Sequence, residues 1–170
     1  MPDTGDAALL ILRMAVGFVF LAHGIKHFRN REKTMRWTAG IGFTSPAIQW
    51  FFMSFAEIGA GFSLTLGLLT AVGAAGVVSL MAVALWTVHR RAGFWITARP
   101  DEGWEYAMVL AAGAVTLGLL GAGEWSLDHA LGIAADLDGG VGALIVAGGV
   151  AAAVGQSMLF YRPLRQPTGS

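Results

Sequence analysis

Five long apolar runs dominate this chain of 170 residues, with centres near Val16, Ile58, Met81, Gly113 and Gly149. Each run is about 20 residues long, which is the length an α-helix needs to cross the hydrocarbon core of a bilayer. The chain also has 24 glycines, and small residues let helices pack closely in lipid. We therefore predict an all-α, polytopic membrane helical bundle in a single domain over residues 1–170. The predicted spans are at about 7–25, 47–69, 71–88, 104–121 and 141–160.

The segments between the runs differ sharply in charge. Ten of the 11 basic residues fall on one predicted side of the membrane: Lys26, Arg29, Arg31, Lys33, Arg36, Arg90, Arg91, Arg99, Arg162 and Arg165. The other side carries acidic residues without a Lys or Arg: Asp3, Asp6, Glu124, Asp128, Asp136 and Asp138. By the positive-inside rule, the N-terminus is expected outside and the C-terminus in the cytoplasm. We expect the lipid bilayer, and no nucleic acid, as a partner.

Two connecting segments have patterns of their own. Residues 27–38 mix bases with aromatic and apolar residues, which predicts an interfacial helix. Residues 124–138 form an outer loop that we expect to contain a short helix, with Ser126 as its N-cap and Asp128 in its first turn. The last span is rich in Gly, Ala and Val, so it is expected to pack against the other spans or against a second copy of the chain.

Arg13 and Glu57 are the ionisable residues nearest the centres of their spans. A charge at membrane depth costs about 2.5 to 3.5 kcal/mol on insertion scales, so such groups are usually paired. The first two spans are antiparallel neighbours, and we therefore predict an ion pair between Arg13 and Glu57. The pair could act as a structural clasp, or it could take part in binding a ligand or handling protons.

A second group of ionisable residues is expected at the cytoplasmic ends of the spans: His23, Lys26, His27, His89 and Glu105. Such a cluster could move protons or bind a polar headgroup, or its members could simply anchor the helices at the interface. His23 and His89 could also be axial ligands of haem b, and His23, His27 and Glu105 could share a metal ion. No binding signature supports either alternative, so the sequence predicts no metal site. The absence of cysteine excludes disulfides, thiolate nucleophiles and iron–sulfur clusters carried by this chain.

Five motifs resemble, in order and spacing, the DoxX family of small bacterial membrane proteins. They are LRMAVGFVFLAHGIKHF, AEIGAGFSLTLGLLT, ALWTVHRRAGF, GWEYAMVLAAG and GLLGAGEWSLD, which together cover roughly residues 9–128. The family pattern maps onto Arg13, His23, Gly24, Lys26, Glu57, His89, Glu105, Ser126, Leu127 and Asp128. The resemblance implies a four-helix core, to which this chain adds a fifth C-terminal transmembrane helix, in the bacterial cytoplasmic membrane. It also implies a link to quinol oxidation, thiosulfate:quinone oxidoreduction or oxidative stress, but no definite enzymatic activity.

Two functional hypotheses follow. In the first, the protein is a redox-linked subunit that binds a quinone or related lipid in its bundle, beside a soluble or membrane oxidoreductase. This hypothesis predicts a cavity with Arg13 and Glu57 deep inside and with His23, His89 and Glu105 at its mouth. In the second, the protein is a non-catalytic anchor or assembly factor whose basic loops recruit a soluble enzyme. That hypothesis predicts a filled bundle and a salt-sensitive interaction.

Overall fold

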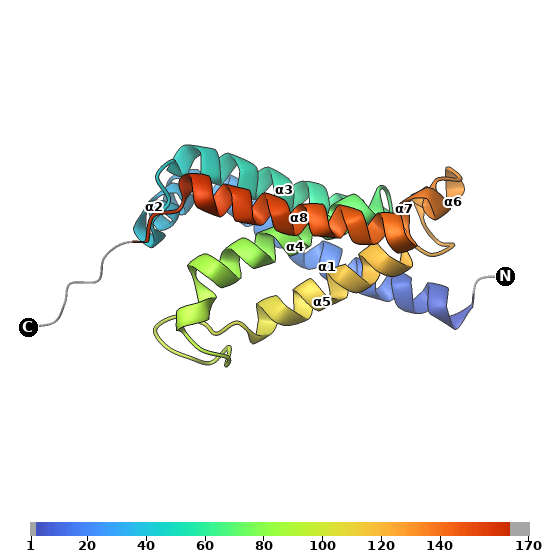
Figure 1. Ribbon diagram of the computed structural model, residues 1–170, viewed down its shortest axis with the longest axis horizontal. Coiled ribbons are helices and arrows are strands. Elements are labelled where there is room, and N and C mark those ends of the chain that lie inside the picture. Colours follow the sequence, from blue (N-terminus) through green and yellow to red (C-terminus); the bar gives the residue numbers. More distant parts are fainter. Residues whose placement is uncertain (1–2, 164–170) are drawn as a thin grey trace, which may run out of the picture.

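The computed structural model describes residues 3–163, which form helices and connecting segments without a β-strand. The longer helices run along the long axis of the molecule (Figure 1). In chain order, the α-helices are α1 (Thr4–Arg29), α2 (Arg31–Ile41), α3 (Pro46–Leu66), α4 (Thr70–Thr87), α5 (Glu105–Leu120), α6 (Leu127–Ala130), α7 (Ala134–Leu137) and α8 (Gly139–Phe160). A 3₁₀ turn, η1 (His89–Arg91), follows α4. The prediction of an all-α bundle is confirmed.

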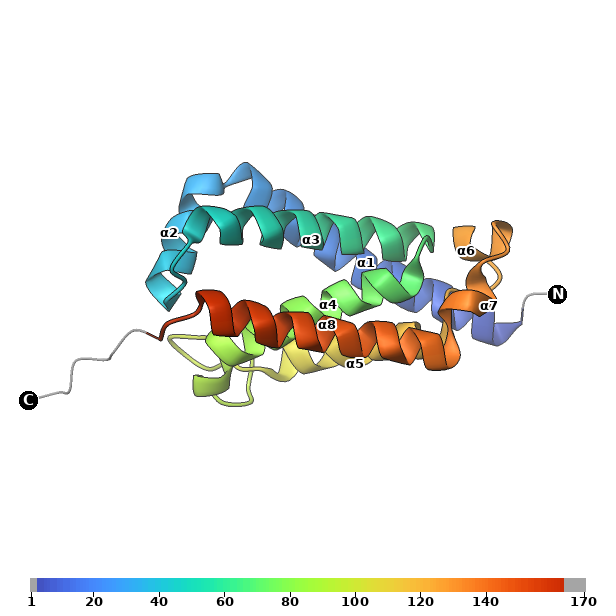
Figure 2. The same ribbon diagram turned by 45° about the horizontal axis from the view of Figure 1, so that its top comes forward.

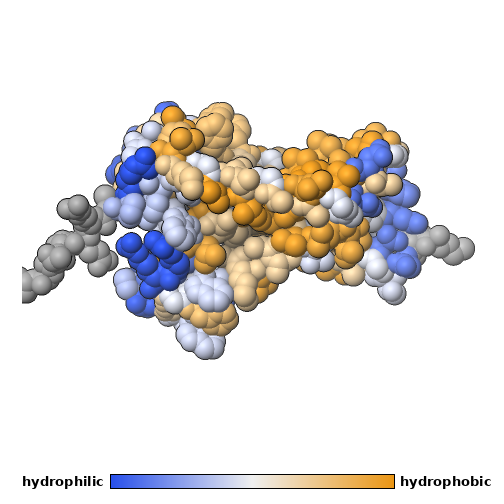
Figure 3. All heavy atoms as spheres, in the orientation of Figure 1, coloured by the Kyte–Doolittle hydropathy of each residue, from blue (hydrophilic) through white to orange (hydrophobic). Residues whose placement is uncertain are grey.

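In the described part of the chain, three helices, α1, α4 and α8, are long and apolar enough to cross a membrane. The helix α5 is apolar but has 16 residues. The helix α3 has 21 residues and carries polar side chains. Hydrophobic residues gather over the middle of the molecule and hydrophilic residues over its two ends (Figure 3). This arrangement is that of a multi-pass membrane protein.

The polar residues of α3 point inward and its aromatic residues point outward. Its buried polar residues are Gln49, Ser54 and Glu57. Its exposed aromatic residues are Phe51, Phe52, Phe55 and Phe62. In a water-soluble bundle the apolar face would be buried, so this inverted pattern is typical of a helix whose outer face meets lipid.

Close approach of the helices depends on glycines in α1, α3 and α8. A Cβ at Gly61 would lie 2.7 Å from the backbone nitrogen of Leu21, and one at Gly24 would lie 2.8 Å from that of Ile58. A Cβ at Gly149 would meet the carbonyl oxygen of Ala75. These glycines let the backbones of α1 and α3, and those of α8 and α4, come into direct contact.

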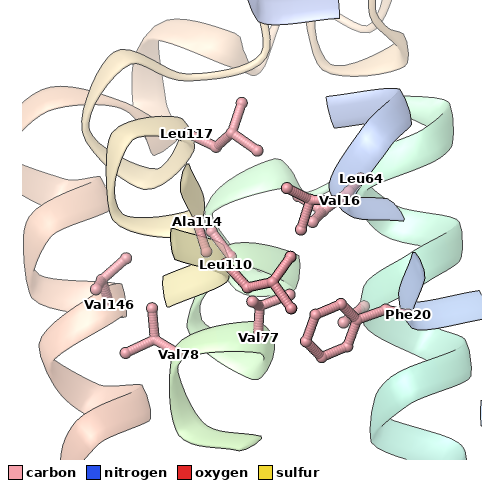
Figure 4. Close-up of a cluster of buried hydrophobic side chains, with 11 residues drawn as sticks. Val16, Phe20, Leu64, Val77, Val78, Leu110, Ala114, Leu117 and Val146 are labelled. Atoms are coloured by element: carbon pink, nitrogen blue, oxygen red, sulfur yellow. The ribbon is translucent and has the colours of Figure 1, made fainter. Parts of the chain in front are cut away.

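The central core of the bundle is built from aliphatic side chains and Phe20 (Figure 4).

The last helix packs within its own chain. Its buried residues are Gly142, Val146, Gly149 and Ala153, a spacing of three and four residues that defines one helical face. This face meets α4 and α5, whereas Leu144 and Met158 on the outer face are exposed. The expected packing of this span against the others is therefore found.

Several segment boundaries differ from the predictions. The first helix continues to Arg29, and the interfacial segment forms a separate helix, α2, that begins at Arg31 after Asn30. The outer loop contains two short helices, α6 and α7, in place of one. The end of the bundle that carries α2 also holds the C-terminal end of α8 (Figures 1 and 2). There, Thr44 donates its backbone N–H to Phe160, and Arg162 donates its own to Gly42.

Candidate functional site

A cavity of about 560 Å³ opens at the α2 end of the bundle. Its walls come from α1, α2, α3, α4, α5 and α8, with further residues from η1 and the segment after it. The inner wall is apolar and includes Phe20, Leu80, Met81 and Leu110. Cavities of this size and lining are typical of small-molecule binding sites in proteins.

A polar group from α1 and α3 occupies one side of the cavity. His23 and His27 are one helical turn apart on α1, and their ring centroids are 6.2 Å apart. Glu57 of α3 faces them, with its Oε1 atom 3.9 Å from Nε2 of His27. Glu57 is 7% exposed, and its Oε2 atom has no hydrogen-bond partner within residues 3–163. Lys26 also lines the cavity and is exposed.

The ring of His27 is held in place from several directions. Its Nδ1 atom lies 3.3 Å from the hydroxyl oxygen of Thr34, which is buried in α2. The indole of Trp37 stacks on the ring with an interplanar angle of 19°. The indole N–H of Trp50 donates to the backbone carbonyl of His27 over 3.1 Å. These contacts point Nε2 of His27 toward α3 and the cavity.

The other side of the cavity carries His89 but not Glu105. The Nδ1 atom of His89 is 2.7 Å from the carbonyl oxygen of Glu102, and both residues line the cavity. Glu105 lies at the first residue of α5, outside the cavity lining, and forms no ion pair within the part of the chain that the structure describes. The structure therefore brings His23, Lys26 and His89 together around one cavity and leaves Glu105 beside it.

The predicted ion pair between Arg13 and Glu57 is wrong. Arg13 is completely buried, and its guanidinium donates to the carbonyl oxygens of Leu64 over 3.1 Å and Trp125 over 2.7 Å. Leu64 lies seven residues beyond Glu57 on α3, which is a separation of about 10 Å along a helix. The Leu64 carbonyl also accepts a bond of 3.3 Å from the backbone N–H of Gly67, and its second lone pair accepts from the guanidinium. Arg13 therefore lies outside the cavity.

Ser126 and Asp128 act together at the end of the bundle opposite the cavity. The Ser126 hydroxyl accepts a hydrogen bond from the backbone N–H of His129, so Ser126 is the N-cap of α6, as the sequence predicts. The Asp128 carboxylate accepts from the backbone N–H groups of Leu69 and Thr70, at 2.6 and 2.9 Å. Asp128 thus caps α4 from a distant loop, while the preceding turn places Leu69 at a φ of 51°.

A comparison with family models finds a match to DoxX over residues 8–90. Residues 8–90 are a DoxX domain. No solved structure matches the chain. The family assignment predicted from the sequence is confirmed, although the match is shorter than the range of the predicted motifs.

The DoxX domain contains α1 from residue 8 onward, all of α2, α3 and α4, and the start of η1. It includes five of the candidate site residues: Arg13, His23, Lys26, Glu57 and His89. The helices α5 and α8, which complete the cavity wall, lie outside the matched range. Ser126 and Asp128 also lie outside it, yet Asp128 binds the turn between α3 and α4 within the domain, through its carboxylate and its backbone N–H.

Sequence reasoning missed three polar residues beside the cavity. Gln156 of α8 donates its side-chain amide to the side-chain oxygen of Gln49 in α3 over 2.6 Å, and both residues line the cavity. Thr34 orients His27 from α2. The two glutamines stand alone in apolar runs, which is a signal that could have selected them. The contact of Thr34 depends on the turn after α1, and its sequence position gives no such signal.

Proposed function

We propose that this DoxX-family protein is a redox-linked membrane subunit that binds a lipid-like ligand of the quinone class in its cavity. The cavity is the observation that carries the proposal, because it joins a polar group on α1 and α3 to an apolar wall inside the bundle. A quinone has the same division, with a polar ring and an apolar isoprenoid tail. A ligand of this class suits a protein without cysteine, because the ligand itself carries the electrons.

The placement of donors supports a polar head at the outer part of the cavity. Lys26 carries three ammonium donors, and His23 and His89 each offer a ring N–H or a ring lone pair. Tyr106 and Trp37 also line the cavity and provide aromatic surfaces for a flat ring. The tail would lie along Phe20 and Leu80, toward the central core.

The membrane placement is part of the proposal. We expect α1, α3, α4, α5 and α8 to cross the bilayer, because the outward-facing aromatic residues of α3 extend the apolar belt that the other helices form. The cavity opens at the end that carries the basic α2 and η1 segments. By the positive-inside rule, this end faces the cytoplasm and the N-terminus lies outside. The expected location is the cytoplasmic membrane of a bacterium.

A membrane anchor that recruits a soluble enzyme is the second candidate. It is favoured by the exposed basic residues at the cavity end, which include Arg31, Lys33 and Arg36 on α2. An anchor needs no internal space, however, and a filled bundle is what that function predicts. The cavity of about 560 Å³ therefore favours the ligand-binding subunit.

The test compares two neighbouring positions on α4. Ala84 lines the cavity, whereas Leu85 is 40% exposed on the outer surface. We expect an isoprenoid quinone to co-purify near one equivalent per chain in mild detergent, as measured by mass spectrometry and ultraviolet absorption of the extract. Ala84→Phe fills part of the cavity and should lower that content at least fivefold, while Leu85→Phe should retain it.

Membranes that contain the Ala84→Phe variant should also reduce an added quinone analogue more slowly than membranes that contain the wild-type protein. If the folded wild-type protein carries no quinone and binds no added analogue, the proposal fails. A soluble protein that co-purifies with such an empty bundle, and dissociates as salt is raised, would instead support the anchor.

A further inference from the structure

The three potential ligand atoms of His23, His27 and Glu57 lie within 4.8 Å of one another. The two histidines project from one face of α1, because residues four apart on a helix are neighbours. Gly24 lies between them and lets α3 approach, since a Cβ there would be 2.9 Å from the Cβ of Glu57. The cluster therefore arises where two backbones are in close contact and does not depend on a flexible loop.

The hydrogen bonds of Thr34 assign the proton of the His27 ring. The Thr34 hydroxyl lies 3.4 Å from the carbonyl oxygen of His27, to which it donates, and so it can accept from the Nδ1–H group. A neutral ring with its proton on Nδ1 has a lone pair on Nε2. That lone pair faces Oε1 of Glu57 at 3.9 Å, which is too long for a hydrogen bond. Two electron-pair donors thus face each other across a short gap.

The second carboxylate oxygen of Glu57 adds an independent observation. Glu57 is more than nine-tenths buried, and its Oε2 atom has no hydrogen-bond partner among residues 3–163. A buried carboxylate oxygen without a partner is costly, and more so at membrane depth. A positive charge between Glu57 and the two imidazoles would remove that cost.

We propose that His23, His27 and Glu57 bind a divalent transition-metal ion of the Zn²⁺ class, with one coordination position open to the cavity. Two imidazoles and one carboxylate form a donor set found in zinc sites that retain an open position. Hard cations such as Mg²⁺ and Ca²⁺ prefer oxygen ligands, so the imidazoles disfavour them. This site goes beyond the proposed quinone site, because its ligands are in place whether or not the cavity is filled.

The geometry requires a small closure of the cluster. Bonds of about 2.0 to 2.1 Å around a tetrahedral zinc ion place its ligand atoms about 3.4 Å apart. The observed spread of up to 4.8 Å closes to that distance if each side chain moves by about 1 Å. Lys26 shares the cavity, but it is exposed and its flexible stem can keep the ammonium near the open end. The contact of Thr34 with Nδ1 would be the outer-shell partner that fixes the imidazole.

The experiment measures metal binding by the full-length chain in detergent, purified through a tag without histidine. After the protein is stripped with a chelator, Zn²⁺ content is measured by mass spectrometry, and Co²⁺ binding by visible absorption and calorimetry. We expect about one ion per wild-type chain. His27→Ala and Glu57→Gln should abolish stoichiometric binding. Thr34→Val should weaken affinity by about 10- to 100-fold, as loss of an outer-shell partner does.

The matched control is His129→Ala, which removes an exposed histidine at the opposite end of the bundle and should leave metal binding unchanged. Absence of a saturable site in the folded wild-type protein would overturn the proposal, and this result does not depend on whether any variant folds. Unchanged affinity in both folded His27→Ala and Glu57→Gln would overturn it as well. Quinone content is measured separately on the metal-stripped protein, so failure of the metal site is distinguishable from failure of the proposed function.

Discussion

Arg13 and Glu57 are both buried, but the surrounding structure uses them in opposite ways. The guanidinium of Arg13 donates to carbonyl oxygens of α3 and of the outer loop, so it joins three segments of the chain. Within residues 3–163 each residue keeps one atom without a hydrogen-bond partner, Nε of Arg13 and Oε2 of Glu57, but only Glu57 lines the cavity. The first residue is therefore expected to govern stability, and the second to govern binding.

Arg13→Lys tests the structural role of the guanidinium while it keeps the positive charge. An ammonium group cannot reproduce the planar arrangement of donors that reaches Leu64 and Trp125 at once. We expect the free energy of unfolding to fall by about 2 kcal/mol, the size of one hydrogen bond to a charged group. The measurement is unfolding by sodium dodecyl sulfate in mixed micelles.

Arg29→Lys is the matched control, because Arg29 is exposed at the end of α1. It should change the free energy of unfolding by less than about 0.5 kcal/mol. Equal stability of the two variants would show that the buried contacts of Arg13 contribute nothing net to the fold.

The candidate residues could be chosen from the sequence, but their partners could not. An ionisable residue in an apolar run is conspicuous, because a charge at membrane depth costs free energy, and this alone singles out Arg13, Glu57 and His23. Which atoms they meet depends on the rotation and the vertical offset of each helix, and an offset of two turns moves a group by about 10 Å. That offset explains why Arg13 reaches the end of α3 and why Glu57 meets His27.

At the scale of elements, glycines in α8 act differently according to the face on which they lie. A Cβ at Gly149 would meet the carbonyl oxygen of Ala75 on α4, whereas a Cβ at the neighbouring Gly148 would meet no atom of residues 3–163 within 4 Å. The long helices and their order could be predicted from hydrophobic runs of the right length. Hydropathy does not encode local turns. The break between α1 and α2 at Asn30 depends on such a turn, and so do the two short helices α6 and α7.

Gly149→Ala should therefore destabilise the protein, and Gly148→Ala should not. Overpacking of a close helix contact costs about 1 to 3 kcal/mol, because α8 must move away from α4. At Gly148 the added methyl group faces open space, and the higher helix propensity of Ala favours a neutral or slightly positive effect. Thermal unfolding of both variants in the same detergent measures the difference. A lower midpoint for Gly148→Ala than for Gly149→Ala would contradict this account of the packing.

At the scale of the whole molecule, the two ends of the bundle differ: one is held together by buried polar contacts, and the other has the cavity and exposed basic residues. The end with α6 and α7 is tied together by Arg13, Ser126 and Asp128. The end with α2 and η1 holds the cavity and the exposed bases. Arg165, which the sequence assigns to this second end, lies outside the described residues.

The absence of cysteine makes the orientation directly measurable, because a single introduced thiol is the sole target for a maleimide. Asp136 in α7 and Lys33 in α2 are exposed at opposite ends of the bundle. We expect Asp136→Cys to react with a membrane-impermeant maleimide in intact spheroplasts. Lys33→Cys should react at least tenfold faster after lysis than before it. The reverse pattern would invert the proposed topology.

The hydrogen bond between Gln49 and Gln156 joins the DoxX domain to a helix outside it. The cavity is thus a composite, with its ionisable group inside the matched residues and part of its wall supplied by the C-terminal half of the chain. Chains that share the first half but diverge in the second would keep the same ionisable residues and surround them with a cavity of different shape. If the proposed ligand binds there, its selectivity could diversify by exchange of the C-terminal half, without change to the ionisable residues proposed to bind its head group.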